Sequence, residues 1–227
     1  MKTSTKFREL VEEFRTVVVG RSNLIDSVVP PVVFVLVNAA LGFEYAMWGS
    51  LAIAAVFGVV RLARRQPLTY ALGGLGGVVA AILIAKLLDR AEGYFLPSII
   101  TGGLTVILCG LSIIARRPLV AWTSYLARRW PLDWYWHPKV RPAYSEVTLA
   151  WTVFFGLRVL LQFLLFRGER AAILAVTNVL AGWPFTVALL AISYIYGTWR
   201  LRQLKGPSVE EFKVGAAPPW TGQRRGF

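Results

Sequence analysis

Charged and reactive side chains are scarce in this chain of 227 residues. It contains one cysteine and one histidine, and only 16% of its residues are charged. One cysteine cannot form an intrachain disulfide, and one cysteine with one histidine cannot supply a Cys/His metal cluster. A soluble domain carries roughly 25% charged residues, whereas 56% of this chain is hydrophobic. The composition therefore excludes a soluble globular enzyme.

The hydrophobic residues come in runs of about 20, the length that crosses the hydrocarbon core of a bilayer. Six runs are predicted to be membrane-spanning helices, at residues 24–43, 45–62, 68–88, 94–115, 146–166 and 171–198. We expect no signal peptide, because the first run starts after about two dozen residues and lacks a small-residue cleavage site. The predicted fold is an all-α membrane protein built as a bundle of six transmembrane helices.

The distribution of cations predicts how the chain is threaded. With the N-terminus in the cytoplasm, 20 Lys and Arg residues lie on the inner side and four on the outer side, and Arg158 lies within a span. The positive-inside rule then places both termini in the cytoplasm of a multi-pass protein of the bacterial inner membrane. The net charge of +13 resides mainly beside the spans, at the anionic leaflet. Lipid, and not nucleic acid, is therefore the predicted partner.

Three parts are predicted along the chain: an arm at residues 1–22, a transmembrane domain at 23–203 and a flexible cytoplasmic tail at 204–227. In the arm, apolar residues recur at helical spacing, which predicts an amphipathic helix at the membrane interface. These residues are Phe7, Leu10, Val11, Phe14 and Val18. Residues 118–144 form an interfacial segment rich in Trp and Pro. For this segment and for the arm, contact with lipid and packing on the bundle are both open. The tail has no apolar period and several Pro and Gly residues.

Small residues mark where helices are expected to pack closely. Gly73 and Gly77 share one face of the third span, and Gly102 and Gly103 lie in the fourth span. Glycine lets two helix backbones approach within a membrane, so these four residues predict helix packing and permit self-association.

Prolines mark expected helix breaks. Pro30 and Pro31 either begin the first span, with Asp26 as its cap, or separate that span from a preceding half-helix. Pro184 predicts a kink in the sixth span, because it removes one backbone donor from the helix.

Arg158 is the most informative residue for function. It lies about 20 Å from the inner interface, where a charge needs a partner or water. The polar residues expected near it or within its reach are Gln162, Asn178, Asn38, Glu44, Asp89 and Glu92. Two interpretations are open. Arg158 belongs to an interhelical hydrogen-bond cluster and reaches an outer carboxylate, or it lines a polar cavity and binds an anionic headgroup, carboxylate or phosphate.

No set of residues in the sequence predicts catalysis. There is no His-Glu-x-x-His motif, pair of intramembrane aspartates or Ser/His/Asp set, so we expect neither an enzyme nor a metal or cofactor site. Two functional hypotheses follow. The first is a non-enzymatic factor of cell-envelope or division maintenance that contacts lipid, other membrane proteins of the envelope or a second copy of itself. The second is a small transporter or lipid-handling protein that uses the polar site at Arg158.

Several stretches together resemble an uncharacterised bacterial membrane family of six spans, the domain of unknown function 3159. These stretches are Asp26–Phe34, Arg61–Leu68, Arg90–Pro97, Arg116–Leu119 and Gly182–Pro184. The resemblance covers roughly residues 20–200 and implies the six-span architecture, without an activity or catalytic residues. The layout is more distantly similar to the intracellular septation protein A family, which would imply a role in division and envelope maintenance.

Overall fold

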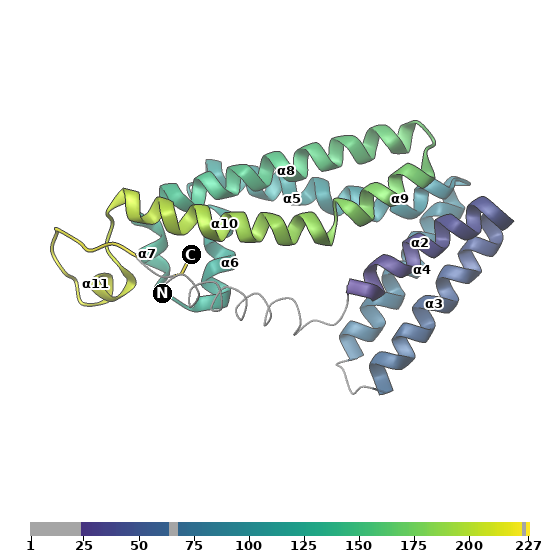
Figure 1. Cartoon of the computed structure of the whole chain (residues 1–227), viewed down its shortest axis with the longest axis horizontal. Helices are drawn as coiled ribbons and strands as arrows, with labels where there is room; N and C mark the ends of the chain where they lie inside the picture. The colour runs from purple at the N-terminus through teal and green to yellow at the C-terminus, as the bar shows by residue number, and fades with distance from the viewer. Residues whose placement is uncertain (1–23, 64–67, 224–225) are drawn as a thin grey trace, which may run out of the picture. The chain divides into compact units, whose positions relative to one another are not determined.

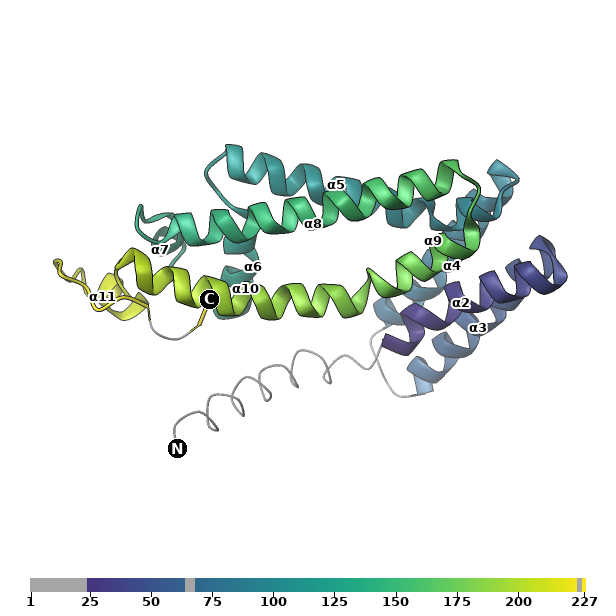
Figure 2. The same cartoon turned by 45° about the horizontal axis from the view of Figure 1, so that its top comes forward.

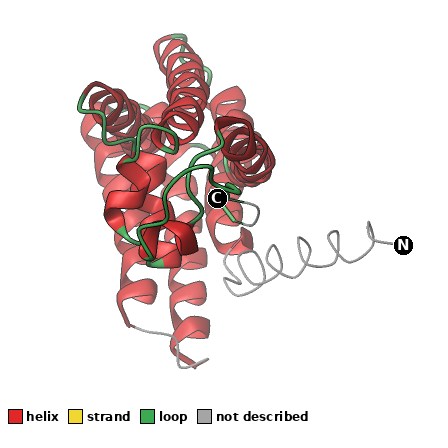
Figure 3. Cartoon of the chain, turned by 90° about the vertical axis from the view of Figure 1, so that its left-hand side faces the viewer, coloured by secondary structure: helices red, strands yellow, loops and turns green. Residues whose placement is uncertain are grey.

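The computed structural model describes residues 24–63, 68–223 and 226–227. These residues are predominantly helical, and no strand occurs among them (Figure 3). The amphipathic helix predicted at residues 1–22 lies outside the described residues. The chain divides into two compact units, the first comprising the residues up to Phe95 with Ala171–Val179 and the second Leu96–Arg170 with Leu180–Phe227.

The first unit is a set of packed helices whose core includes aromatic rings. Its elements are α2 (Leu24–Leu41), α3 (Phe43–Ala63), α4 (Leu68–Leu88), the 3-10 helix η1 (Ala91–Phe95) and most of α9 (Ala171–Leu180). Phe34 of α2 is fully buried and stacks on Tyr94, with ring centroids 4.3 Å apart. A Cβ atom at Gly93 would lie 2.8 Å from the Cα atom of Ala85, so the close approach of η1 to α4 requires glycine there.

The second unit is built around one long helix. Its elements are α5 (Leu96–Ile114), α6 (Leu119–Arg128), α7 (Leu132–Trp136), α8 (Arg141–Arg167), α10 (Trp183–Leu204) and α11 (Val209–Lys213). Helix α8 contacts α5, α6, α7 and α10, and α5 runs beside it in Figures 1 and 2. The core lies at the start of α8, where Trp134, Tyr135 and Tyr144 are fully buried.

Helix length and composition indicate a membrane protein. Within the part of the chain that the structure describes, four stretches are long and apolar enough to cross a membrane: Phe43–Val60, Ala91–Ile114, Arg141–Arg167 and Ala171–Leu204. They coincide with four of the six predicted spans. The other two predicted spans correspond to α2 and α4, whose apolar stretches Pro30–Leu41 and Leu72–Leu88 are shorter.

The prolines act differently from one another. Helix α2 continues as one element through Pro30 and Pro31, which corrects the prediction of a break or a helix start at these residues. Proline is tolerated inside apolar membrane helices, where neighbouring groups satisfy the freed carbonyl. Pro184, in contrast, lies in the first turn of α10, after α9 has ended at Leu180. The predicted kink is thus replaced by an interruption between two helices, with Pro184 in the first turn of the second.

The C-terminal tail packs on the aromatic core of the second unit, which corrects the prediction of a flexible segment. Helix α11 begins with a capping box, in which Ser208 and Glu211 each accept a hydrogen bond from the other's backbone N–H. The indole Nε1 of Trp134 donates to the carbonyl of Pro207 at 2.9 Å. These local polar bonds, together with burial of tail residues in the aromatic core, hold a segment that composition alone describes as loop.

Candidate functional site

Arg158 lies in the middle of α8, within a candidate membrane span. Its side chain is half-buried, and its Nε atom is buried without a hydrogen-bond partner among the described residues. The neighbouring Leu157 and Leu161 are exposed, as expected of side chains that face lipid. A guanidinium N–H that is removed from water and left unpaired is unfavourable by about 1–3 kcal/mol or more. The half-buried guanidinium side chain of Arg158 is therefore the clearest candidate for contact with a ligand.

Gln162 extends the polar surface of α8 by one turn, as the sequence predicts. Its side chain is 1% exposed, and its Nε2 atom lies 3.5 Å from the hydroxyl oxygen of Ser98 on α5. Ser98 was not predicted, because only the packing of α5 on α8 brings it to this place. Arg158 and Gln162 thus form one polar strip, with the Gln162 end closed by α5.

Helices α5 and α8 approach each other closely next to this strip. A Cβ atom at Gly102 would lie 2.6 Å from Cγ2 of Val159, so the prediction of tight packing holds at Gly102. A Cβ atom at Gly103, Gly73 or Gly77 would meet no described atom within 4 Å. The structure therefore shows no close helix packing at these three glycines within the described residues.

The start of α10 lies beside α8 one turn before Arg158. The ring of Phe154 on α8 stacks on that of Phe185 in the first turn of α10, with centroids 6.3 Å apart. Arg158 follows Phe154 by four residues and lies on the same face of α8. Its side chain is therefore one helical turn away from the contact between Phe154 and Phe185. Pro184 therefore interrupts the helix close to the level of the charged residue.

The remaining predicted polar residues belong to the first unit. Asn38 is half-buried in α2, and Asn178 donates from Nδ2 to the carbonyl of Leu174 on its own helix at 3.3 Å. Glu44 is exposed in the first turn of α3. Asp89 is exposed in the turn after α4, with φ of 50°.

Glu92 has a structural role that differs from the expected one. The sequence suggests it as an outer carboxylate for Arg158, but its side chain is 7% exposed and its Oε1 atom accepts a hydrogen bond from the backbone N–H of Ala171 at 3.1 Å. Ala171 is the first residue of α9. A carboxylate at a helix N-terminus satisfies a free backbone donor and complements the helix dipole. Glu92 thus caps α9.

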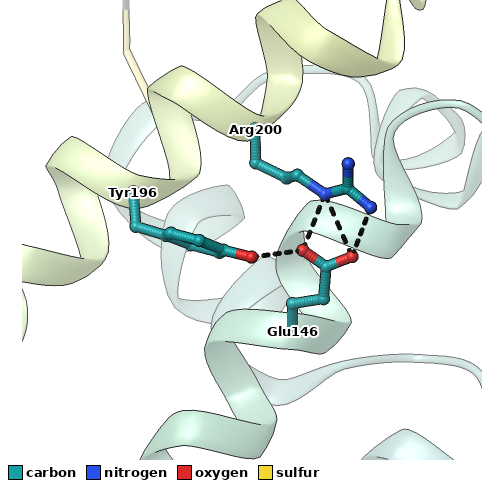
Figure 4. A network of polar contacts seen from close by, with 3 residues as sticks. All are labelled: Glu146, Tyr196 and Arg200. Atoms are coloured by element: carbon teal, nitrogen blue, oxygen red, sulfur yellow. Dashed lines mark hydrogen bonds and ion pairs between the residues drawn. The ribbon is translucent and has the colours of Figure 1, made fainter.

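An ion pair that the sequence analysis missed joins α8 to α10 (Figure 4). Arg200 donates from Nε and Nη2 to the Glu146 carboxylate at 2.8–3.1 Å, and the Tyr196 hydroxyl donates to Glu146 Oε2 at 2.7 Å. Deeper along the same two helices, the indole of Trp151 donates to Ser193 Oγ at 2.8 Å. The only sequence signal was a lone acid at the start of the fifth span.

The aromatic core at the start of α8 has the properties of a structural element. Burial raises the pKa of the Tyr135 hydroxyl, against the opposing effects of its hydrogen bond with Ser124 and the charge of Arg128. Burial, followed by the charge of Lys139, lowers the pKa of His137, so its imidazole is neutral at pH 7.

No group of three or more His, Cys, Asp or Glu side chains placed to hold a metal ion occurs in the residues that the structure describes.

The sequence of this chain matches a known protein family over most of its length. Residues 18–203 match the family described as "Protein of unknown function (DUF3159)". The chain belongs to this family. No curated protein and no solved structure matches it, so the distant similarity to septation protein A is not shown.

The DUF3159 match covers both halves of the candidate site. It includes α5 and α8, with Arg158, Gln162 and Ser98, and it ends at residue 203, near the end of α10. Helix α11 and the packed tail lie beyond the matched residues. The polar strip on α8 therefore lies inside the matched range, and the tail contacts lie outside it.

Proposed function

We propose that this DUF3159 protein is a non-enzymatic, six-span protein of the bacterial inner membrane that binds an anionic ligand at Arg158. The ligand class is an amphiphile or solute with a phosphate or carboxylate group. The observation that carries the proposal is the half-buried Arg158 side chain within a candidate membrane span, whose Nε atom lacks a hydrogen-bond partner in the described part of the chain.

The chemistry of the surrounding residues supports an anionic ligand. Guanidinium presents several donors in a planar fork that matches phosphate and carboxylate oxygens. A charge in mid-membrane is unfavourable by several kcal/mol unless it has a partner or water, and an anion supplies both charge and acceptors. Leu157, Leu160 and Leu161 are exposed beside it, which suits acyl chains. An ionisable group at this depth is by default a hypothesis for a functional site.

Helix lengths and charges support the six-span topology. Helix α2 has 18 residues and α4 has 21, or about 27 and 32 Å at 1.5 Å per residue, close to the ~30 Å hydrocarbon core. With these two counted as spans, 20 cations lie on one side and four on the other. The positive-inside rule then favours cytoplasmic termini.

The test is native mass spectrometry of the full chain released from nanodiscs that contain phosphatidylethanolamine and phosphatidylglycerol. We expect the wild-type protein to retain an anionic adduct whose mass separates a phospholipid from a smaller solute. Arg158→Gln is expected to lower the retained fraction at least tenfold, equivalent to ~1.4 kcal/mol of binding free energy. Arg158→Lys is expected to retain part of it, because the charge remains but the fork is lost.

The matched control is Arg167→Gln, which removes an exposed cation from the last turn of the same helix. It is expected to keep the adduct. Thermal unfolding of each variant separates lost binding from lost folding. The proposal fails if folded wild-type protein carries no anion, or if Arg158→Gln and Arg167→Gln release the adduct equally. A co-purifying envelope protein in place of an anion would favour a role through protein contacts.

A further inference from the structure

Helix α6 lies where two candidate spans end. The span of α5 ends at Ile114 and that of α8 begins at Arg141, so the segment between them emerges at one membrane face. The backbone N–H of Val120 donates to Thr148 Oγ1 of α8 at 3.3 Å, which ties α6 to the side of α8. This hydrogen bond joins Val120 to Thr148 and does not involve Arg158.

The position of that bond along α8 fixes the depth of α6. Helix α8 has 27 residues, or about 40 Å, so it exceeds a ~30 Å hydrocarbon core by ~10 Å. Thr148 follows the helix start at Arg141 by seven residues, or about 10 Å along the axis. With exposed Arg167, in the last turn of α8, taken as lying at the opposite interface, this excess falls at the start of α8. The start of α6 is then level with the boundary between the headgroups and the hydrocarbon.

The two faces of α6 differ in what they contact. One face is buried against the rest of the second unit and carries Val120, Ala121 and Ser124, whose side chains are 5%, 0% and 8% exposed. Trp122 and Leu126, one turn apart on another face, are 39% and 62% exposed. Tryptophan and leucine side by side at this depth are typical of a helix that lies in the plane of the membrane.

Cations surround this exposed apolar face at both ends of the helix. Arg116, Arg117 and Arg129 are exposed. Asp133 is the only acid between residues 116 and 145, against six Lys and Arg residues. The guanidinium of Arg117 lies 4.4 Å from the ring centre of Trp136, which keeps a positive charge next to the aromatic surface. The charge of the segment complements anionic headgroups.

We propose that α6 is an in-plane membrane anchor whose exposed face, Trp122 and Leu126 with Arg116, Arg117 and Arg129, binds an anionic phospholipid surface. The apolar side chains enter the acyl boundary and the guanidiniums bind lipid phosphates. This anchor fixes the start of α8, and with it the aromatic core, against the leaflet. It is distinct from the mid-membrane site at Arg158.

The test uses a spin label at residue 126 in the full chain. A Leu126→Cys variant is made in a Cys109→Ala background, because Cys109 is the only cysteine, and is placed in nanodiscs of phosphatidylcholine with or without phosphatidylglycerol. Collision with oxygen, which enters lipid, is compared with collision with a water-soluble nickel chelate. The matched control carries the label at Val214, an 80% exposed residue of the tail.

We expect the oxygen-to-nickel ratio at residue 126 to be at least threefold higher than at residue 214, and to rise further with phosphatidylglycerol. Arg116→Gln with Arg129→Gln is expected to abolish the rise. Lys205→Gln with Lys213→Gln, which removes the same charge from other exposed positions, is expected to leave it intact. A ratio equal to that at residue 214 would overturn the proposal. So would a label that neither reagent reaches, since protein would then cover α6.

Discussion

Replacing Gly102 with alanine is the sharpest test of how α5 and α8 pack. The added Cβ atom would lie 2.6 Å from Cγ2 of Val159, whereas carbon atoms make their best contact at about 3.5–4.0 Å. One helix must therefore move by about 1 Å, or the valine must leave its rotamer. Valine in a helix has one strongly preferred χ1 rotamer, so the backbone has to give. Overpacking of this kind destabilises proteins by about 1–3 kcal/mol.

The neighbouring residue supplies a matched control. A Cβ atom at Gly103 meets no described atom within 4 Å, so Gly103→Ala adds the same group without a clash. Alanine is favoured over glycine in a helix interior by about 0.5–1 kcal/mol. We expect Gly103→Ala to be neutral or stabilising. Because the gain in helix propensity is common to both variants, they should differ by the cost of the clash alone, about 1–3 kcal/mol.

Unfolding in mixed detergent micelles, followed by circular dichroism, measures this difference. Val159→Ala removes the opposing methyl groups, so in the double variant with Gly102→Ala most of the loss should be recovered. Two residues in contact show such coupling, whereas distant ones add independently. Equal stability of Gly102→Ala and Gly103→Ala would refute the packing argument, and so would strict additivity in the double variant.

Two further predictions concern the aromatic core and the tail. Tyr144 Oη is buried without a partner among the described residues, whereas Tyr135 Oη lies 3.2 Å from Ser124 Oγ. In the same unfolding assay, Tyr144→Phe should be neutral or stabilising. Tyr135→Phe should destabilise the protein by about 1 kcal/mol, because it removes a hydrogen bond. Backbone hydrogen bonds from Ser208 lead the effects that lower the pKa of Glu211 to about 2. The contribution of the Glu211 carboxylate to tail stability should therefore be complete above pH ~4.5 and lost as the pH falls toward 2. In NMR spectra, the chemical shift of the Ser208 amide should accordingly titrate near pH 2. A midpoint near 4.5 would contradict this assignment.

The helices are predictable where hydrophobicity alone defines them. The apolar run predicted at 68–88 coincides with α4 as a helix, because this segment is apolar along its whole length. The sixth span shows the limit of this signal. Residues 171–198 read as one apolar run, yet α9 ends at Leu180 and α10 starts at Trp183. Hydropathy does not register an interruption of two residues, and Pro184 alone is compatible with a kink or a helix start.

The candidate site was predictable only along its own helix. Spacing by four residues places Arg158 and Gln162 on one side of α8. Ser98 and Glu146 were missed as partners because their contacts depend on how α5 and α10 pack against α8, which periodicity does not specify. The tail is a different case. Ser208 and Glu211 match the sequence pattern of a capping box, and the Pro and Gly content of the surrounding residues obscured it.

The treatment of charge along α8 supports a ligand site more than a structural one. Glu146 near the start of the helix is about one-third exposed, yet Arg200 binds it through two nitrogens and Tyr196 adds a third donor. Arg158 lies deeper within the candidate span, and its Nε atom is buried without a partner in the described chain. Stability alone would favour the opposite arrangement, because pairing matters most where water is absent. Departures from locally favourable chemistry concentrate at functional sites. The described residues leave this nitrogen without an acceptor, which is the arrangement expected if Arg158 binds the anionic ligand proposed above.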